Sequence, residues 1–546
     1  MIETGRSPAR VRVAPTVKGR PSFFVTWGVA AACSFAISAL TYLALGRSLG
    51  FDTMNYEFSS GFGLLHGFGS KYALAGQLQT YLDAQVNVFY YLLLRYLPSA
   101  VAGLGIVLVE SIGVGLLVPV AAAAARQSGF GRATSYLLGG IAGVSGLISP
   151  NYVHELGSTF SDTIILLPLL ASAGILAVQL LQVGRHFSNL SCELAGACLG
   201  VALIVKLTSA TCVLGILLGL FVAIALGQQR HGLWTAIRAT AITGGVAVAV
   251  FIIVYLPTTG LLLWRRYGNP LFPYYNSVFR SRVILPGNWR DTRWTVSSLT
   301  QAVHHVHSLL FGGMGLDEYW VRAPILVVGT MFLAALLVFD LLRRRQPVTL
   351  FIEMSIVVGF LSWFFQFGYY RYSAVLEMVL PAAVIAAVLL HRLHTHLVVV
   401  LLAIVTLLST LAGSVSFAES DRAPLNGSEF GVTADSHISA VSDRVLLTTG
   451  APMGFLVRYF PNDTKVVRIG GNLVNVMSPL WWREVRAYVT SQGAQWSLVF
   501  EAGQENKALS ELNLAHLNAT VKLCTPIIAV YTLESCAVAI VSPSTG

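Results

Sequence analysis

The chain has 546 residues, of which 55% are hydrophobic and only 11% are charged. Soluble domains carry about 25% charged residues, so this composition excludes an ordinary soluble protein and predicts a membrane protein. The formal net charge of +10 would indicate a nucleic-acid partner in a soluble chain. In a membrane protein, cytoplasmic Lys and Arg residues and an anionic ligand explain it better, so no nucleic acid is expected.

Long apolar segments follow one another through most of the chain. With about 20 apolar residues as the length of a span, the sequence predicts eleven transmembrane helices. They cover residues 23–46, 101–124, 133–149, 162–182, 190–206, 209–227, 239–257, 324–342, 348–368, 373–391 and 396–414. The polar residues 206–208 mark the division between the fifth and sixth spans.

Basic residues predict the orientation of these spans. Residues 1–20 form a basic segment, and Arg residues follow alternate spans, which places the N-terminus in the cytoplasm. The odd number of spans then places residues 415–546 outside, together with the outer loops 47–100, 150–161 and 258–323. Loop 258–323 is itself rich in Arg, which the positive-inside rule tolerates in long loops. No eukaryotic targeting signal is apparent, so we expect a multi-pass protein of a bacterial plasma membrane.

Residues 415–546 differ from the apolar part of the chain. They hold 20 of the 60 Asp, Glu, Lys and Arg residues, and their apolar residues form short runs. Strands are expected at 444–449, 465–469, 496–500 and 527–533, with a helix at about 453–460. This pattern predicts a small extracytoplasmic α/β domain.

Three features of this domain have open interpretations. Cys524 and Cys536 could form a disulfide if the domain lies on an oxidising side of the membrane. Trp481 and Trp482 could contact a glycan or rest on the membrane interface. The domain has no nucleotide-binding or zinc-binding motif.

Ionisable residues at the outer ends of the spans are the candidates for chemistry, because such groups are costly unless solvated, paired or functional. They are Asp52, Glu57, His154, Glu155, Asp162, Lys206, Arg265, Arg266 and Arg371. A carboxylate can act as a general base, and Arg or Lys can stabilise a phosphate that leaves. The group therefore suits a substrate with a hydroxyl group and a lipid phosphate.

The acidic first outer loop, the acidic turn from Glu155 to Asp162 and the stretch 268–276 resemble the GT-C superfamily of membrane glycosyltransferases, in its bacterial members. The resemblance runs across most of residues 20–414, and includes two loop helices expected before the second span. It rests most directly on Phe51-Asp52-Thr53-Met54-Asn55-Tyr56.

The resemblance implies an inverting hexosyl- or pentosyltransferase. A polyprenyl-phosphate sugar would be the donor, and a hydroxyl group of a cell-envelope glycan or glycolipid would be the acceptor, on the outer face of the bilayer. The acid of the first outer loop, here Asp52, would be the general base, with Glu155 and Asp162 as further catalytic candidates. The substrate-binding candidates are Glu57, His154, Lys206, Arg265, Arg266 and Arg371.

Structural interpretations stand beside these roles. Asp52 or Asp162 could cap a helix, Lys206 could extend its amine to the interface, and Arg371 could anchor an aromatic belt. The outer loops lack an Asp-x-Asp pair, so no metal ligands are assigned and the need for a divalent metal ion stays open.

Two other functions also stay open. A transporter or flippase of lipid-linked glycans would place ionisable groups along a path through the membrane. A glycan polymerase or ligase that uses lipid pyrophosphate donors would not need an acid after the first span.

Overall fold

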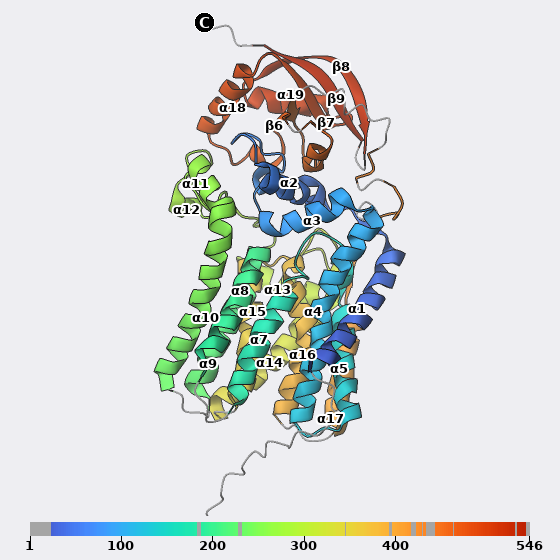
Figure 1. Cartoon of the computed structure of the whole chain (residues 1–546), viewed down its shortest axis with the longest axis vertical. Helices are drawn as coiled ribbons and strands as arrows, with labels where there is room; N and C mark the ends of the chain where they lie inside the picture. The colour runs from blue at the N-terminus through green and yellow to red at the C-terminus, as the bar shows by residue number, and fades with distance from the viewer. Residues whose placement is uncertain are drawn as a thin grey trace, which may run out of the picture.

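A helical bundle forms one end of the molecule and a β-sheet domain forms the other (Figure 1). This computed structural model describes residues 23–182, 187–227, 232–343, 346–391, 396–416, 422–427, 430–432, 443–461, 463–529 and 532–541. Two helices of the first outer loop, α2 (Phe58–His66) and α3 (Ala84–Tyr96), lie between the two ends. The predicted basic segment 1–20 is outside the described residues.

All eleven segments that were predicted as spans are helical. They form α1 (Phe23–Leu45), α4 (Ser99–Gln127), α5 (Arg132–Leu147), α7 (Leu166–Leu181), α8 (Asn189–Val205), α9 (Ala210–Leu226), α10 (Gly232–Tyr255), α14 (Pro324–Arg343), α15 (Pro347–Gln366), α16 (Ala374–Leu390) and α17 (His396–Leu411). Seven helical segments in the described part of the chain are long and apolar enough to cross a membrane. The chain is therefore a multi-pass membrane protein. Helices α5, α7, α8 and α17 have 16 or 17 residues, so the count of eleven spans stays a prediction.

The polar break at residues 206–208 has the predicted effect. Helix α8 ends at Val205, Lys206 has an extended backbone, and a short 3-10 turn over Leu207–Ser209 leads into α9. The break places the side chain of Lys206 at the end of the bundle that faces the C-terminal domain.

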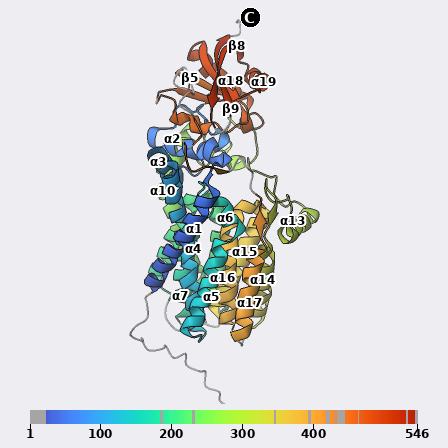
Figure 2. The same cartoon turned by 90° about the vertical axis from the view of Figure 1, so that its right-hand side faces the viewer.

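The outer loops contain most of the short elements. A π-helical turn, Thr53–Glu57, leads into α2, and α2 and α3 are the two loop helices expected before the second span. The turn after α5 begins with α6 (Pro150–Glu155), where Pro150 occupies the first helical turn and the Ser149 hydroxyl accepts a hydrogen bond from the Tyr152 N–H. Helix α10 continues through a π-helical turn into α11 (Leu261–Tyr267), followed by α12 (Asn276–Phe279) and α13 (Leu299–Phe311), which stands out from the bundle (Figure 2).

The C-terminal domain contains a five-stranded mixed sheet with the order β6-β5-β7-β9-β8. Strands β5 (Arg444–Leu447), β6 (Lys465–Arg468) and β7 (Gln495–Glu501) are parallel, whereas β8 (Asn518–Ile528) and β9 (Thr532–Val541) join antiparallel. Helices α18 (Pro479–Ser491) and α19 (Glu505–Leu514) complete the α/β domain.

Two local predictions for this domain need correction. Residues 527–533 do not form one strand, because they include the end of β8, the connection and the start of β9. Ile527 and Ile528 belong to β8 and Leu533 belongs to β9, so apolar residues of two paired strands looked like one continuous run in the sequence. The helix expected at 453–460 is a 3-10 turn over Gly454–Arg458.

The sheet domain packs directly on the outer loops. Short strands link the two parts: β1 (Arg47–Ser48) pairs with β4 (Arg422–Ala423), and β2 (Val321–Arg322) pairs with β3 (Ser414–Val415). Trp481 is fully buried, and its ring lies 5.5 Å from that of Tyr72 in the first outer loop. Trp481 therefore fixes the domain to this loop, and both interpretations offered for it, glycan contact and membrane contact, are wrong.

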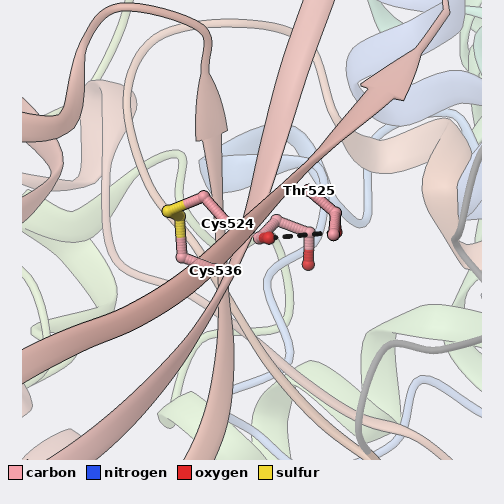
Figure 3. Close-up of a disulfide and its surroundings, with 4 residues drawn as sticks. Cys524, Thr525 and Cys536 are labelled. Carbon is pink, nitrogen blue, oxygen red and sulfur yellow. Dashed lines mark hydrogen bonds between the residues drawn. A yellow bond between two sulfur atoms is a disulfide. The ribbon is translucent and has the colours of Figure 1, made fainter.

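Cys524 of β8 and Cys536 of β9 are opposite each other and form a disulfide (Figure 3). Next to them, the Thr525 hydroxyl donates a hydrogen bond of 3.3 Å to the Ser535 carbonyl oxygen. Disulfides persist in oxidising compartments, so this bond is compatible with the predicted outer location of the domain.

Candidate active site

A cavity of about 1480 Å³ lies between the helical bundle and the C-terminal domain. The first outer loop, the turn after α6, the start of α9, the end of α15 and loop 258–323 all contribute to its wall. Asn472 and Asn475 reach it from the C-terminal domain. Pockets for drug-sized ligands measure about 300–1,000 Å³, so this cavity has room for larger or paired substrates.

The wall of the cavity combines polar and apolar side chains. Toward the membrane, Leu214 of α9 and Phe365 of α15 contribute to the wall, together with Leu207. Toward the C-terminal domain, Gln79 and the two asparagines contribute amide groups. Thr211 of α9 and Gln366 of α15 also line the cavity, so a ligand with both apolar and polar parts would find partners in this wall.

Asp52 and Arg371 form an ion pair at the wall of this cavity. Asp52 directly precedes the π-helical turn, and Arg371 lies in a 3-10 turn, Tyr370–Ser373, that opens α16. An Arg371 Nη2–H donates to Asp52 Oδ2 over 2.8 Å, and the guanidinium lies 4.2 Å from the centre of the Phe160 ring. The two side chains are 17% and 12% exposed, so both reach the cavity without being open to bulk solvent.

A second ion pair lies behind the first. Lys206 Nζ contacts Asp162 Oδ2 at 2.5 Å and also donates to the carbonyl oxygen of Phe160. The side chains of Lys206 and Asp162 are only 5% and 2% exposed. Arg371 Nε lies 3.5 Å from Asp162 Oδ2, which joins the two pairs into one cluster of two acids and two bases.

Glu57 and Glu155 are fully enclosed and do not line the cavity. The Thr159 hydroxyl donates to Glu57 Oε2 and is itself 2.5 Å from the Thr53 hydroxyl. Burial raises the pKa of Glu57 well above its ordinary value, and the charge of Asp52 raises it further. Burial and then the charge of Asp162 do the same to the pKa of Glu155. Both carboxyl groups therefore favour their protonated form, which cannot accept another proton.

His154 lies at the cavity wall, where it is held as a neutral imidazole. Burial lowers its pKa to about 4, and the positive charges of Arg422 and Arg371 act in the same direction. Arg422, from the linker before the C-terminal domain, donates hydrogen bonds to the carbonyl oxygens of His154 at 2.7 Å and Leu156 at 2.8 Å. The linker thus fixes the turn that carries His154.

The arginines of loop 258–323 fall into two groups. Arg265 and Arg266 do not line the cavity: Arg265 is exposed on α11, and Arg266 donates to the Gly69 carbonyl oxygen at 2.6 Å and the Tyr81 hydroxyl at 3.1 Å. Arg290 and Arg293 do line it. The structure therefore brings Arg290 and Arg293, and not the predicted Arg265 and Arg266, to the cavity.

Glu110, mid-way along α4, supports the same turn from below. Its two carboxylate oxygens accept hydrogen bonds from the Gly157 N–H at 2.9 Å and the Thr163 hydroxyl at 3.1 Å. The mid-span acid is thus paired within the bundle.

Sequence reasoning missed an acidic pair in the cavity wall, Asp317 and Glu318. Glu318 contacts Arg293 at 2.7 Å and accepts a hydrogen bond of 2.7 Å from the Tyr369 hydroxyl. Burial, followed by the charge of Glu318, raises the pKa of Asp317 to about 8. Two adjacent acids at the end of an Arg-rich loop were the available signal.

The arrangement can accept a proton and hold an anion, but it shows no metal-ligand set at the cavity. In the part of the chain that the structure describes, no group of three His, Cys, Asp or Glu ligand atoms gathers at the cavity. Asp52 and Asp162 are each paired with a basic side chain instead. Whether a divalent metal ion takes part therefore stays open.

No family model matches this chain, and no curated protein matches its sequence. Among solved structures, the chain is similar to ArnT from Cupriavidus metallidurans bound to undecaprenyl phosphate, with 13% sequence identity and a TM-score of 0.47. This match covers 95% of this chain and 99% of that chain. The Archaeoglobus fulgidus oligosaccharyltransferase in its apo form has 11% identity, coverage of 89% and 72%, and a TM-score of 0.43. AglB from the same organism, in complex with an inhibitory peptide and a dolichol-phosphate, has 12% identity, coverage of 89% and 71%, and a TM-score of 0.40. The chain is thus structurally similar, at low sequence identity, to ArnT and AglB, and the function proposed below rests on its own residues.

Proposed function

We propose that the chain is an inverting glycosyltransferase that moves a sugar from a polyprenyl-phosphate donor to a hydroxyl group of a cell-envelope glycan or glycolipid. The observation that carries the proposal is the Asp52–Arg371 pair at the wall of the large cavity. It joins a carboxylate that can take a proton to a guanidinium that can bind a phosphate. The proposed location is the outer face of a bacterial plasma membrane.

Asp52 is the proposed general base because the other three acids among the candidates from the sequence, Glu57, Glu155 and Asp162, are enclosed. Glu57 and Glu155 favour their protonated forms, and Asp162 is held by Lys206 behind the cavity wall. Asp52 alone among these four acids lines the cavity. Asp162 and Lys206 then act as supports that position Arg371.

The reaction forms one bond and breaks one. The acceptor oxygen attacks the anomeric carbon while its proton passes to the Asp52 carboxylate. The bond between the anomeric carbon and the phosphate oxygen breaks, and its electron pair leaves with the polyprenyl phosphate. Arg371, with Arg290 and Arg293 at the same wall, would stabilise the negative charge that develops on this phosphate.

Within this proposal, each substrate occupies its own part of the cavity. The isoprenoid tail of the donor would lie along the apolar wall formed by Leu214 and Phe365. The acceptor would enter beneath the C-terminal domain, where Asn472 donates to Gln79 Oε1 over 2.9 Å and Asn475 lies close by in the wall. Amide groups in this place can donate and accept hydrogen bonds with sugar hydroxyls.

The test is sugar transfer by the purified full chain in lipid nanodiscs, supplied with a panel of polyprenyl-phosphate sugars. Wild type should transfer at least one sugar, and Asp52→Asn should lower the rate by about 10²–10⁴-fold, the usual contribution of a general base. Glu155→Gln is the matched control, because it removes an enclosed carboxyl group of the same site and should retain transfer.

Each other outcome points to a different function. Full transfer by Asp52→Asn would contradict Asp52 as the base. Binding of an intact lipid-linked glycan without transfer from any donor would indicate a transporter or flippase. Transfer from lipid pyrophosphate donors alone, insensitive to Asp52→Asn, would indicate a polymerase or ligase.

A further inference from the structure

A second cluster of ionisable side chains lies at the end of the bundle that faces away from the C-terminal domain. It contains Asp340 of α14, Glu353 of α15 and His391, which directly follows α16. Asp340 and Glu353 are 0% exposed and His391 is 8% exposed. Helix α16 has 17 residues and so spans about 25 Å, with Arg371 before its start and His391 after its end. The cluster is therefore separate from the cavity.

The three side chains are close enough to share one ion. His391 Nε2 lies 2.8 Å from Glu353 Oε1 and 3.5 Å from Asp340 Oδ2, and one ligand atom of each residue lies within 4.8 Å of the others. Ligand atoms around a tetrahedral divalent ion lie roughly 3.4 Å apart when the ion–ligand distances are about 2.1 Å. The distance of 2.8 Å between His391 Nε2 and Glu353 Oε1 would therefore need to increase only slightly for an ion to fit between the side chains.

Glu353 supplies an independent sign that the cluster takes a ligand. Its Oε1 contacts His391, but its buried Oε2 has no hydrogen-bond donor among the described residues. Buried carboxylate oxygens are nearly always hydrogen-bonded or coordinated, because they lose their hydration on burial. A cation bound by both carboxylate oxygens of Glu353 would satisfy this oxygen.

The surroundings also suit a metal ligand. The Thr349 hydroxyl, one turn into α15, donates to Asp340 Oδ2 over 2.5 Å. Hydrogen bonds of this kind orient ligating carboxylates in metal sites. One imidazole and two carboxylates favour first-row divalent ions over Mg²⁺ or Ca²⁺, which prefer ligand sets made of oxygen alone.

We propose that Asp340, Glu353 and His391 bind one first-row divalent metal ion, with Zn²⁺ as the probe, which ties α14, α15 and α16 together at this end of the bundle. The site goes beyond the proposed glycosyl transfer and takes no part in its chemistry. Asp340 and Glu353 come from α14 and α15, and His391 directly follows α16, so the ion would act as a structural link between the ends of three helices.

The test measures metal content and metal affinity directly. Full-length protein without a histidine tag, in nanodiscs, is stripped with a chelator, incubated with Zn²⁺, freed of excess ion and analysed by elemental mass spectrometry. Wild type should retain one Zn²⁺ per chain, and substitution with Co²⁺ should give visible absorption bands of nitrogen and oxygen coordination. Glu353→Gln should lower the affinity by at least tenfold, because it removes a charged ligand but keeps the side-chain volume.

Two further variants locate the site. His391→Asn should also release the ion and remove the Co²⁺ bands. Asp52→Asn should retain one Zn²⁺, which separates this site from the proposed active site. Wild type without bound Zn²⁺, or Glu353→Gln with unchanged affinity, would overturn the proposal and leave a hydrogen-bonded histidine–carboxylate cluster only.

Discussion

The two ends of the helical bundle hold buried ionisable clusters that differ in access and in composition. At the end beneath the C-terminal domain, Asp52 and Arg371 reach a cavity of about 1480 Å³, while Asp162 and Lys206 lie behind them. At the other end, Asp340, Glu353 and His391 are buried. Both clusters contain buried carboxyl groups beside basic side chains, so the presence of such residues does not by itself show which cluster could be catalytic. Access to a cavity is what makes the first one suitable for catalysis on a substrate.

The charges of the two clusters also differ in kind. The outer cluster pairs its carboxylates with Arg371 and Lys206, which are cationic at any ordinary pH. The inner cluster contains a histidine, whose charge depends on a proton. The outer cluster is thus complete as a set of ion pairs, whereas the inner cluster can exchange a proton for a metal ion. Three substitutions at the end beneath the C-terminal domain test the outer half of this comparison.

The largest effect is expected from Lys206→Met, which tests the outer cluster as a set of ion pairs. It leaves Asp162 buried with only the longer contact of 3.5 Å to Arg371. Removal of one partner of a buried ion pair typically costs about 3–5 kcal/mol. We expect a lower thermal unfolding temperature in nanodiscs and a loss of transfer, since Arg371 loses its support.

The double variant Lys206→Met with Asp162→Asn is the matched control. It removes both charges, so no buried carboxylate is left behind and much of the stability should return. An unchanged unfolding temperature in Lys206→Met would show that the pair does not hold this end of the bundle.

The sequence predicted the members of the outer cluster but not their contacts. Asp52 and Arg371 are 319 residues apart, and only the order of the spans indicated that both lie on the same side of the membrane. The order of spans does not say which helix ends meet, because that depends on how the helices pack. The length of the apolar runs likewise predicted the eleven helical segments well. It failed at 527–533, where two paired strands and their connection share one apolar run.

Arg422 is the clearest case of a residue without a signal in the sequence. Its guanidinium donates hydrogen bonds to the backbone carbonyl oxygens of residues 154 and 156, which lie more than 260 positions earlier in the chain. No motif encodes such a contact, since a carbonyl oxygen is present at every residue. Asp317 and Glu318 had a weak signal as adjacent acids, but only the fold brings them to the cavity.

A smaller effect is expected from Arg422→Met, which separates the linker from the outer turn. Hydrogen bonds from a charged donor contribute about 1.5–3 kcal/mol, and the substitution removes those that Arg422 donates to the turn that carries His154. The turn can then move, and kcat should fall by roughly tenfold or more. Lys465→Met, at an exposed lysine of the C-terminal domain, is the control and should retain full transfer. Equal rates for Arg422→Met and wild type would mean that the other contacts of the turn, such as those of Glu110 and Glu57, hold it in place without Arg422.

The smallest effect concerns the pH dependence of the cavity wall. Because burial and Glu318 raise the pKa of Asp317 to about 8, this carboxyl group is neutral at pH 7 and becomes negative above pH 8. The added charge would repel a donor phosphate by roughly 1 kcal/mol, so kcat/KM should fall about fivefold between pH 7 and pH 9. Asp317→Asn cannot ionise and should lack this fall while retaining the rate at pH 7. The same fall in both proteins would place the titrating group elsewhere. A profile that is flat to pH 9 in wild type would mean that Asp317 is already charged at pH 7. The outer cavity would then tolerate a charged carboxylate that has no basic partner, in contrast to the buried cluster at the other end of the bundle.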